Sequence, residues 1–209
     1  MARAPSFCGV VLAAGESSRM GRDKALLPWP PRSSAGSQAG TFLSGAIQLL
    51  QPYTQLVIVV AGKNADSISP VVYAHGAFLA VNRAPERGQF SSLQVGLQEV
   101  LNRGRDAAIV ALVDRPPAQP STVELLCRAF SEAVERGTWA VIPEYGGKHG
   151  HPIVVGREMI EAFLKAPPTS TARDVEHSLQ PRIVYVPVDD PPVVANVDTP
   201  EDYAALKMQ

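Results

Sequence analysis

The chain has 209 residues, of which 45% are hydrophobic and 19% charged, and its formal net charge is −1. This length suits one compact domain spanning residues 1–209, and this composition excludes a disordered chain. A charge so near zero gives no field that would attract nucleic acid or an anionic membrane, so neither is an expected partner.

No segment for export or membrane insertion is evident from the sequence. Apolar runs such as residues 56–61 are far too short to span a bilayer, and the amino terminus lacks the plan of a signal peptide. We therefore expect a cytoplasmic protein. Cys8 and Cys127 occupy apolar positions without metal-ligand spacing, and they are expected to be buried free thiols.

Short apolar segments rich in β-branched residues alternate with amphipathic segments along the chain, which is typical of strands buried on both faces. The expected strands are residues 7–12, 56–61, 78–81, 107–113, 140–142 and 183–188. Two of the expected helices present the apolar faces Phe42, Ala46, Leu49, Leu50 and Leu93, Leu97, Val100, Leu101. This alternation predicts a three-layer α/β/α sandwich with a Rossmann-like, mostly parallel sheet. Its ligands should bind beyond the carboxyl ends of the strands.

Helix-start signals mark two further helices. Ser121, with Glu124 three residues later, predicts a capping box at the start of one helix. Thr199 is the expected N-cap residue of the last helix, with Pro200 at its first position. Residues 28–40, rich in Pro, Ser and Gly, are expected to form a flexible surface insertion.

A run of small, hydroxyl and cationic residues follows the first expected strand directly. It reads Leu-Ala-Ala-Gly-Glu-Ser-Ser-Arg-Met-Gly-Arg-Asp-Lys over residues 12–24. Small residues let a backbone approach a phosphate chain, and free amides in such a bend form an anion-binding nest. Arg19 and Lys24 supply positive charge for a triphosphate or its leaving pyrophosphate. The run matches neither the Walker A motif nor the dinucleotide motif, so the residues alone predict an anion-binding loop.

This loop resembles the Leu-Ala-Ala-Gly-x-Ser-x-Arg-Met-Gly-x-x-Lys signature of the molybdenum cofactor nucleotidyltransferases, which attach a cytidylyl or guanylyl group to molybdopterin. Every signature position is matched, and sugar-nucleotide and methylerythritol cytidylyltransferases share a looser form. The resemblance implies the nucleotide-diphospho-sugar transferase type of fold. It also implies contacts to the triphosphate from Arg19 and Lys24. The loop residues expected to bind the nucleotide are Leu12, Ala13, Ala14, Gly15, Arg19 and Lys24.

Two aspartates are candidates for magnesium ligands. Asp114 follows the strand 107–113 at the carboxyl edge of the expected sheet, although a turn residue before Pro116 is an equal alternative for it alone. The sequence Asp-Arg-Pro at residues 114–116 resembles the Asp-x-Pro magnesium motif of the family, in which the middle residue is often Gln. Residues 196–203 are similar to the closing segment of the family, which makes Asp198 the second expected ligand. Asp198 is alternatively an ordinary helix-start residue.

Three polar residues are second-rank candidates for nucleotide contacts. Asn82, Ser91 and Ser92 belong to a stretch that looks like the loop and helix with which the family approaches the nucleotide. Free amides at a helix start receive phosphate or a base edge, but simple N-capping by either serine is an equal alternative.

The residues expected to bind the acceptor match the pattern of the family less completely than the nucleotide loop does. Gly-His-Pro at residues 150–152 resembles the family element across the cleft from the nucleotide, and His149 stands where Arg is usual. His151 and Arg115 are therefore the expected acceptor-binding residues. At residues 169–173 only Ala-Arg survives of a family stretch that commonly carries Gly-Asp before it.

The resemblance implies an enzyme that transfers CMP or GMP from CTP or GTP onto a phosphorylated acceptor, molybdopterin first, with release of pyrophosphate. Its expected catalytic residues are Arg19, Lys24 and Asp114, and its cofactor is Mg²⁺ held by Asp114 and Asp198. A molybdoenzyme or its maturation factor is an expected protein partner. Two alternatives stay open: a sugar-, polyol- or phospholactate-type phosphate as acceptor, and a maturation factor that binds a nucleotide without turnover. Base preference, oligomeric state and the role of the insertion also stay open.

Overall fold

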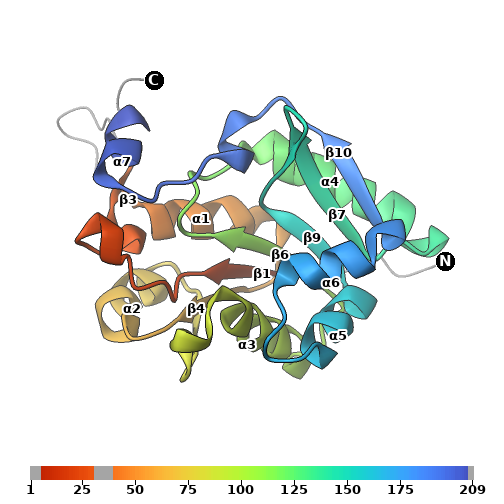
Figure 1. Ribbon diagram of the computed structural model, residues 1–209, viewed down its shortest axis with the longest axis horizontal. Coiled ribbons are helices and arrows are strands. Elements are labelled where there is room, and N and C mark those ends of the chain that lie inside the picture. The colour runs from red at the N-terminus through yellow and green to blue at the C-terminus, as the bar shows by residue number, and fades with distance from the viewer. Residues whose placement is uncertain (1–5, 31–39, 207–209) are drawn as a thin grey trace.

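The computed structural model describes residues 6–30 and 40–206. They form one central sheet with helices on both faces (Figure 1). The strand order is β10-β7-β9-β6-β1-β4-β5, and β8 pairs with β7. The strands are β1 (Phe7–Leu12), β4 (Val57–Ala61), β5 (Phe78–Val81), β6 (Ala107–Leu112), β7 (Ala140–Tyr145), β8 (Lys148–His149), β9 (Ile153–Gly156) and β10 (Ile183–Pro187).

The prediction of a mostly parallel sheet is confirmed, and all six expected strands are present. Strands β6, β1, β4 and β5 run parallel to one another, as do β7 and β10. The sequence reading did not include β9, which lies antiparallel between β6 and β7. Its four residues follow a proline and lead straight into a helix, so periodicity alone does not identify it.

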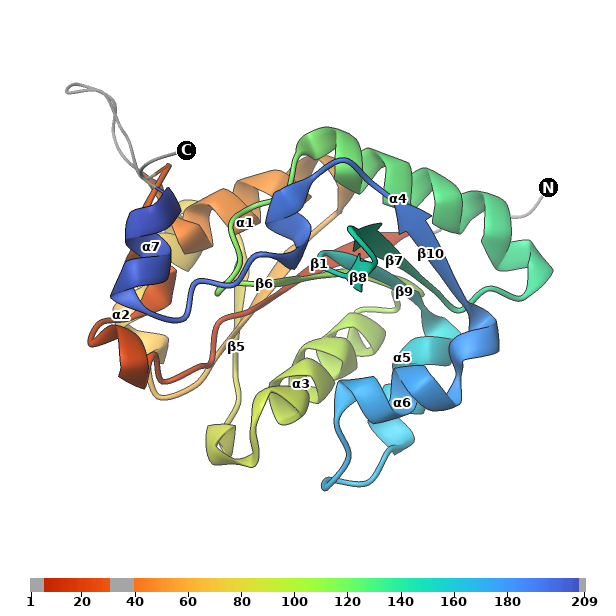
Figure 2. The same ribbon diagram turned by 45° about the horizontal axis from the view of Figure 1, so that its top comes forward.

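Helices cover both faces of the sheet, which confirms the three-layer architecture. Figure 2 shows α1 and α4 on one side and α3, α5 and α6 on the other. Val11 of β1 belongs to the core under the first set, and its neighbour Val10 belongs to the core under the second. The helices are α1 (Phe42–Leu50), α2 (Ala65–Ala74), α3 (Gln89–Asn102), α4 (Pro120–Ala133), α5 (Arg157–Lys165), α6 (Ala172–Ser178) and α7 (Pro200–Leu206).

A glycine brings α3 very close to the sheet. A Cβ atom at Gly96 would lie 2.6 Å from Cγ1 of Val10 and 2.9 Å from Cγ2 of Val60. Only a residue without a side chain fits there. This contact holds α3 against β1 and β4, and it fixes the start of the helix beside the carboxyl ends of those strands.

The helix α4 begins differently from the prediction. It starts at Pro120 with Gln119 as its N-cap residue, so the predicted capping box of Ser121 and Glu124 is wrong. Proline is favoured at the first helical position because its missing N–H is not needed there. The carboxylate of Asp190, buried at 1% exposure, accepts a hydrogen bond from the Gln119 amide at 2.8 Å. A distant carboxylate thus stabilises this helix end in place of a local cap.

The last helix begins as predicted. The Thr199 hydroxyl accepts a hydrogen bond from the Asp202 amide at 3.2 Å, and Pro200 is the first residue of α7. The ends of the expected insertion, β2 (Pro28–Trp29) and β3 (Gly40–Thr41), pair as a short antiparallel ribbon. The predicted flexible insertion covers residues 28–40, of which residues 31–39 lie outside the described residues.

The structure bears on two further predictions, the state of the cysteines and the lack of a membrane-spanning segment. Cys8 is buried, Cys127 is partly buried, and both are free thiols. Burial raises the pKa of both thiols, that of Cys127 to about 11, so neither is a reactive thiolate at neutral pH. Among the described residues, no helix has both the length and the apolar character needed to cross a bilayer.

Candidate functional site

The first loop, residues 12–24, leaves the carboxyl end of β1 in a fixed series of bends. Ser17 adopts the left-handed conformation with φ of 51°, and Gly21 follows with φ of 70°. The Ser17 hydroxyl accepts a hydrogen bond from the Lys24 amide at 3.0 Å, which closes the loop on itself. Left-handed residues turn successive amides toward one side, as in an anion-binding nest.

A residue that the sequence reading missed holds the back of this loop. The side-chain amide of Asn64, after β4, donates to the Ala13 carbonyl at 2.9 Å and to the Asp23 carboxylate at 2.7 Å. Its oxygen accepts a hydrogen bond from the Gly62 amide. The only signal in the sequence was its place just beyond an apolar strand, where parallel strands end together. Asn64 therefore fixes the loop from the neighbouring strand.

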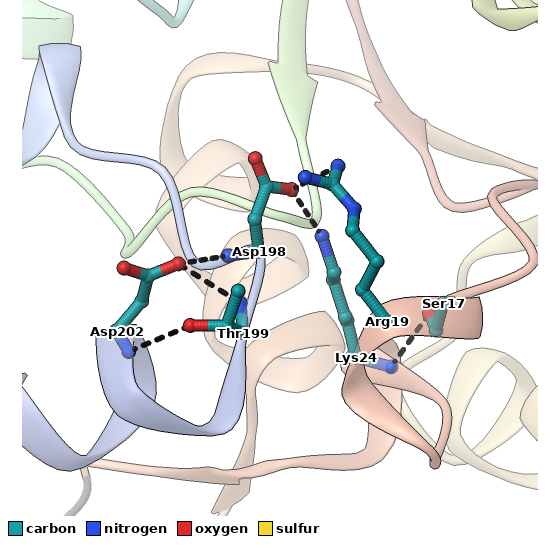
Figure 3. A network of polar contacts seen from close by, with 6 residues as sticks. All are labelled: Ser17, Arg19, Lys24, Asp198, Thr199 and Asp202. Atoms are coloured by element: carbon teal, nitrogen blue, oxygen red, sulfur yellow. Dashed lines mark hydrogen bonds and ion pairs between the residues drawn. The ribbon is translucent and has the colours of Figure 1, made fainter.

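Two cations of the loop converge on one carboxylate from the end of the chain (Figure 3). The Lys24 ammonium lies 2.6 Å from Oδ1 of Asp198, and Nη2 of Arg19 lies 3.3 Å from the same oxygen. The Lys24 side chain is 12% exposed and that of Arg19 is 69% exposed. The hydrogen bond from Lys24, with the charges of both cations, lowers the pKa of Asp198. Asp198 is therefore ionised at neutral pH.

The segment that carries Asp198 is tied down on both sides. The Asp202 carboxylate accepts hydrogen bonds from the amides of Asp198 and Thr199 at 2.9 and 2.8 Å (Figure 3), and these bonds lower its pKa. The Val197 amide donates to the main-chain carbonyl of Asp114 at 2.8 Å. The two predicted metal ligands, from β6 and from the start of α7, are thus brought to the same place.

Asp114 has an unmet hydrogen-bonding capacity. Its Oδ1 atom is buried and has no hydrogen-bond partner within residues 6–30 and 40–206. Buried carboxylate oxygens are costly without a partner, so such an atom points to a missing donor or cation. The structure brings Asp114 and Asp198 together, while their role as ligands stays a prediction.

A small pocket of about 190 Å³ opens between the first loop and the start of α3. Most of the predicted nucleotide residues line it, whereas Ala13 is buried behind the loop. The lining residues that were predicted are Leu12, Ala14, Gly15, Lys24, Ser92 and Asp114. Arg19 does not line this pocket, and its ion pair with Asp198 connects it to Lys24, which does.

Gly15 provides a sharp test of whether phosphate occupies the loop. A Cβ atom there would have nothing within 4 Å, and the residue has no left-handed φ, so a methyl group fits the free protein. We expect Gly15→Ala to leave the melting temperature unchanged and to weaken nucleoside triphosphate binding by about tenfold, because the methyl group blocks the approach of phosphate to the backbone. Calorimetric titration with the triphosphate measures this. Undiminished affinity would show that phosphate does not contact this part of the loop.

Asn82 and the paired serines form one buried cluster. The Asn82 amide donates to the hydroxyls of Ser91 at 2.8 Å and Ser92 at 3.0 Å, and its oxygen accepts from the Ala84 amide. The Ser91 hydroxyl also donates to the Gly88 carbonyl at 2.7 Å. Asn82 and Ser91 therefore shape the turn before α3, and Ser92 is the member of the cluster that lines the small pocket. Their predicted contacts with nucleotide stay a prediction.

A second, larger cleft of about 1090 Å³ adjoins the small pocket. The two share Leu12, Gly88 and Gln89 as lining residues, so a ligand in one reaches the other. Both predicted acceptor residues, Arg115 and His151, line this large cleft. The large cleft is therefore the candidate place for a second substrate beside a ligand in the small pocket.

The carbonyl of Val193 joins the two acceptor-side elements. It accepts hydrogen bonds from Nη1 of Arg115 at 2.6 Å and from the amide of His151 at 2.9 Å. A Cβ atom at Gly150 would lie 2.3 Å from this same oxygen, so only glycine permits the contact. Nε of Arg115 and Nδ1 of His151 are buried without partners among the described residues. Two unpartnered nitrogens therefore border the Asp114 end of the large cleft.

Two titratable groups in the large cleft have strongly shifted pKa values. Burial, with the nearby charge of Arg115, lowers the pKa of His151 to about 3, so its ring is neutral at physiological pH. Burial raises the pKa of Glu176 on α6 to about 7, although Arg173 one turn earlier opposes this shift. Sequence reasoning did not identify Glu176, because its partial burial arises only when α6 packs over the cleft.

The two shifts give opposite dependences of stability on pH. Folded Glu176 keeps its proton between 4.5, the ordinary pKa of a glutamate, and about 7, so its contribution to stability falls as pH rises through that window. Folded His151 stays neutral between about 3 and 6.5, the ordinary pKa of a histidine, so its contribution rises with pH there. The two effects oppose each other between pH 4.5 and 6.5. A substitution of only one of the two residues is therefore needed to measure either effect by itself.

We expect Glu176→Gln to be more stable than the wild type at pH 8, by on the order of 2 kcal/mol after a discount for partial exposure. The gain should shrink toward zero near pH 4.5, because the wild-type carboxyl is then protonated in the folded state and increasingly so in the unfolded state. Urea denaturation across this range measures the difference. Glu158→Gln, an exposed change on α5, is the matched control and should show no such trend. A gain independent of pH would contradict the raised pKa.

Comparison with known proteins gives consistent matches along nearly the whole chain. The family of the MobA-like NTP transferase domain matches residues 9–183. A molybdenum cofactor cytidylyltransferase of Escherichia coli (strain K12) is 24% identical and aligns over 95% of this chain and 94% of its own. A probable molybdenum cofactor guanylyltransferase of Mycobacterium ulcerans is 28% identical over 97% and 94%. The crystal structure of Rv0371c from Mycobacterium tuberculosis H37Rv superposes with a TM-score of 0.78 at 26% identity and covers 100% of both chains.

Proposed function

The chain belongs to the MobA-like NTP transferase family, and we propose that it transfers CMP or GMP from CTP or GTP onto the phosphate of molybdopterin. One observation carries the proposal. The first loop brings Lys24 and Arg19 to Asp198, beside an Asp114 oxygen that is buried and unpartnered among the described residues. Cations for a triphosphate and carboxylates for a metal thus come from neighbouring segments at the small pocket, which Lys24 and Asp114 line. Relatives named for both base types support the choice of CMP or GMP.

The donor set fits a magnesium ion. Magnesium prefers one or two carboxylates and completes its octahedron with phosphate oxygens and water. Asp114 and Asp198 provide two carboxylates, and no cluster of three or more His, Cys, Asp or Glu residues suited to a metal occurs in the described ranges. The unpartnered Oδ1 of Asp114 is the atom that a cation would satisfy. When bound, magnesium would neutralise charge on the reacting phosphates.

The transfer itself needs little covalent chemistry from the protein. An oxygen of the acceptor phosphate attacks the α-phosphorus, a new diphosphate linkage forms, and the bond from the α-phosphorus to the bridging oxygen breaks to release pyrophosphate. The acceptor phosphate is already an anionic nucleophile, so positioning and charge stabilisation suffice. Lys24 and Arg19 are placed to stabilise the negative charge of the departing pyrophosphate.

The acceptor phosphate would enter from the large cleft. Arg115 places a guanidinium there whose Nε has no partner among the described residues, next in sequence to Asp114. Neutral His151 provides a hydrogen-bonding ring without adding charge. These two residues are the proposed acceptor ligands. A molybdoenzyme or its maturation factor is the proposed recipient of the product.

Pyrophosphate release tests this function. Each of CTP, GTP, UTP and ATP is incubated with the protein, magnesium and either molybdopterin or a sugar-, polyol- or phospholactate-type phosphate. We expect release with CTP or GTP and molybdopterin. If pyrophosphate is released only with a sugar-, polyol- or phospholactate-type phosphate, the acceptor belongs to that class and is not molybdopterin. Binding of CTP or GTP, seen as a rise in melting temperature, without turnover for any acceptor would favour a non-catalytic maturation factor.

A further inference from the structure

The large cleft contains one carboxylate that the transfer reaction does not use. Its charged lining side chains are the cations Arg87, Arg115, Lys148 and Arg173 and the single acidic residue Glu176. Cations suit the phosphate of an acceptor. A carboxylate repels that phosphate, so Glu176 must serve another part of the ligand or none at all.

Glu176 is partly buried, and Arg173, three residues earlier, is the cation whose charge acts on it. Its carboxylate has no hydrogen bond or ion pair to any described residue, and burial disfavours its charged form. Burial raises the pKa of Tyr185 on β10, and the charge of Glu176 adds to that shift. A charge retained in a partly buried site at a cost to stability is typical of functional residues. The missing partner is therefore expected to be a donor on a ligand.

The ring of His149, which borders the same cleft, stacks on the ring of Tyr185. Their centroids are 3.9 Å apart with an interplanar angle of 11°, and His149 lines the large cleft. The lining of the cleft also includes apolar residues, among them Leu112, Phe90 and Ile153. A flat heterocycle with polar edges suits such a site, because its faces pack on apolar groups while its N–H donors need an acceptor.

We propose that Glu176 recognises the heterocycle of the acceptor by accepting hydrogen bonds from the ring N–H and the exocyclic amine of its 2-amino-4-oxopyrimidine edge. A carboxylate offers two oxygens in the spacing of two parallel N–H donors, so the pair is bidentate. This assignment rests on the proposed function, because the pterin of molybdopterin carries such an edge. The phosphate of the acceptor then lies at the Arg115 end of the cleft and its heterocycle at the α6 end.

Kinetics at pH 8 with molybdopterin test the assignment. We expect Glu176→Gln to raise the KM for molybdopterin by about tenfold to a hundredfold, with kcat and the KM for the nucleotide changed less than about threefold. Glu158→Gln on the exposed surface of α5 is the matched control. A merely structural role would change both KM values or kcat instead. An unchanged KM for molybdopterin in an active Glu176→Gln variant would overturn the inference and leave the proposed function intact.

Binding of two small probes tests the contact between Glu176 and the exocyclic amine separately. Pterin carries the 2-amino group, and lumazine has an oxygen in its place. The wild type should bind pterin about tenfold more tightly than lumazine, and Glu176→Gln should lose this preference. Fluorescence titration measures both without turnover, so the result does not depend on the identity of the phosphorylated acceptor. Equal binding of the two probes by the wild type would overturn the inference even if nucleotidyl transfer is observed.

Discussion

Asp114→Asn should lower the rate of pyrophosphate release by about a thousandfold or more, equivalent to about 4 kcal/mol of lost transition-state stabilisation. The variant removes the charge of the carboxylate whose Oδ1 is buried without a partner among the described residues. Its fold should persist, because the bond that ties Asp114 to Val197 uses the main-chain carbonyl, which asparagine retains. Initial rates at saturating magnesium and nucleotide measure the effect.

The opposite end of the same strand provides the control. Asp106 precedes β6 and forms an exposed ion pair with Arg157 at 2.7 Å. Asp106→Asn removes an equal charge far from the carboxyl edge and should leave turnover within about twofold of the wild type, since exposed pairs contribute little. Titration with magnesium separates the two variants further. If Asp114→Asn retains most of its turnover, Asp114 is not a ligand and serves only as a turn residue.

The residues that are placed by strand order were predictable from the sequence. Asp114 follows an apolar strand, and Lys24 ends a loop that follows another, so the topology of a parallel sheet puts both at one edge. Asp198 required the resemblance, because local signals explain its segment equally well as a helix start. Its bond to Lys24 joins residues 174 positions apart, and no spacing rule predicts such a contact.

The residues that sequence reasoning missed act through contacts between distant segments. Asn64 donates to the Ala13 carbonyl of the first loop, and Asp190 accepts from the Gln119 amide before α4. An isolated Asn or Asp in the sequence gives no sign of such a partner. The error at Ser121 has the same origin, because Asp190 replaces the local cap that the pattern favoured. Glu176 is ordinary in sequence, and its shifted pKa is a consequence of tertiary burial. Local patterns thus locate elements, while the polar partners of a site depend on packing.

Lys24→Met should weaken nucleoside triphosphate binding by about tenfold to a hundredfold and lower turnover further, because charge-assisted hydrogen bonds contribute about 1.5–3 kcal/mol each. Methionine keeps the buried stem of a side chain that is only 12% exposed, so the loop should retain its shape. The loss should be larger in turnover than in binding, since the charge on pyrophosphate grows as the bond breaks. Calorimetric titration with the triphosphate and initial rates of pyrophosphate release measure the two losses.

The same substitution changes Asp198 in a predictable direction. Its pKa is lowered first by the hydrogen bond from Lys24, so the pKa should rise in Lys24→Met, with Arg19 providing the remaining shift. A lowered carboxylate pKa stabilises the fold at pH values above the unfolded-state pKa, and this stabilisation is lost as the pH falls through the folded-state pKa. The variant should therefore be less stable than the wild type at neutral pH, and the difference should disappear in acid. Arg22→Met removes an equal charge from the same loop beside the ring of Tyr203, and it is the control. Equal losses of nucleotide affinity in the two variants would mean that the loop attracts the triphosphate by its total charge, with no contact specific to Lys24.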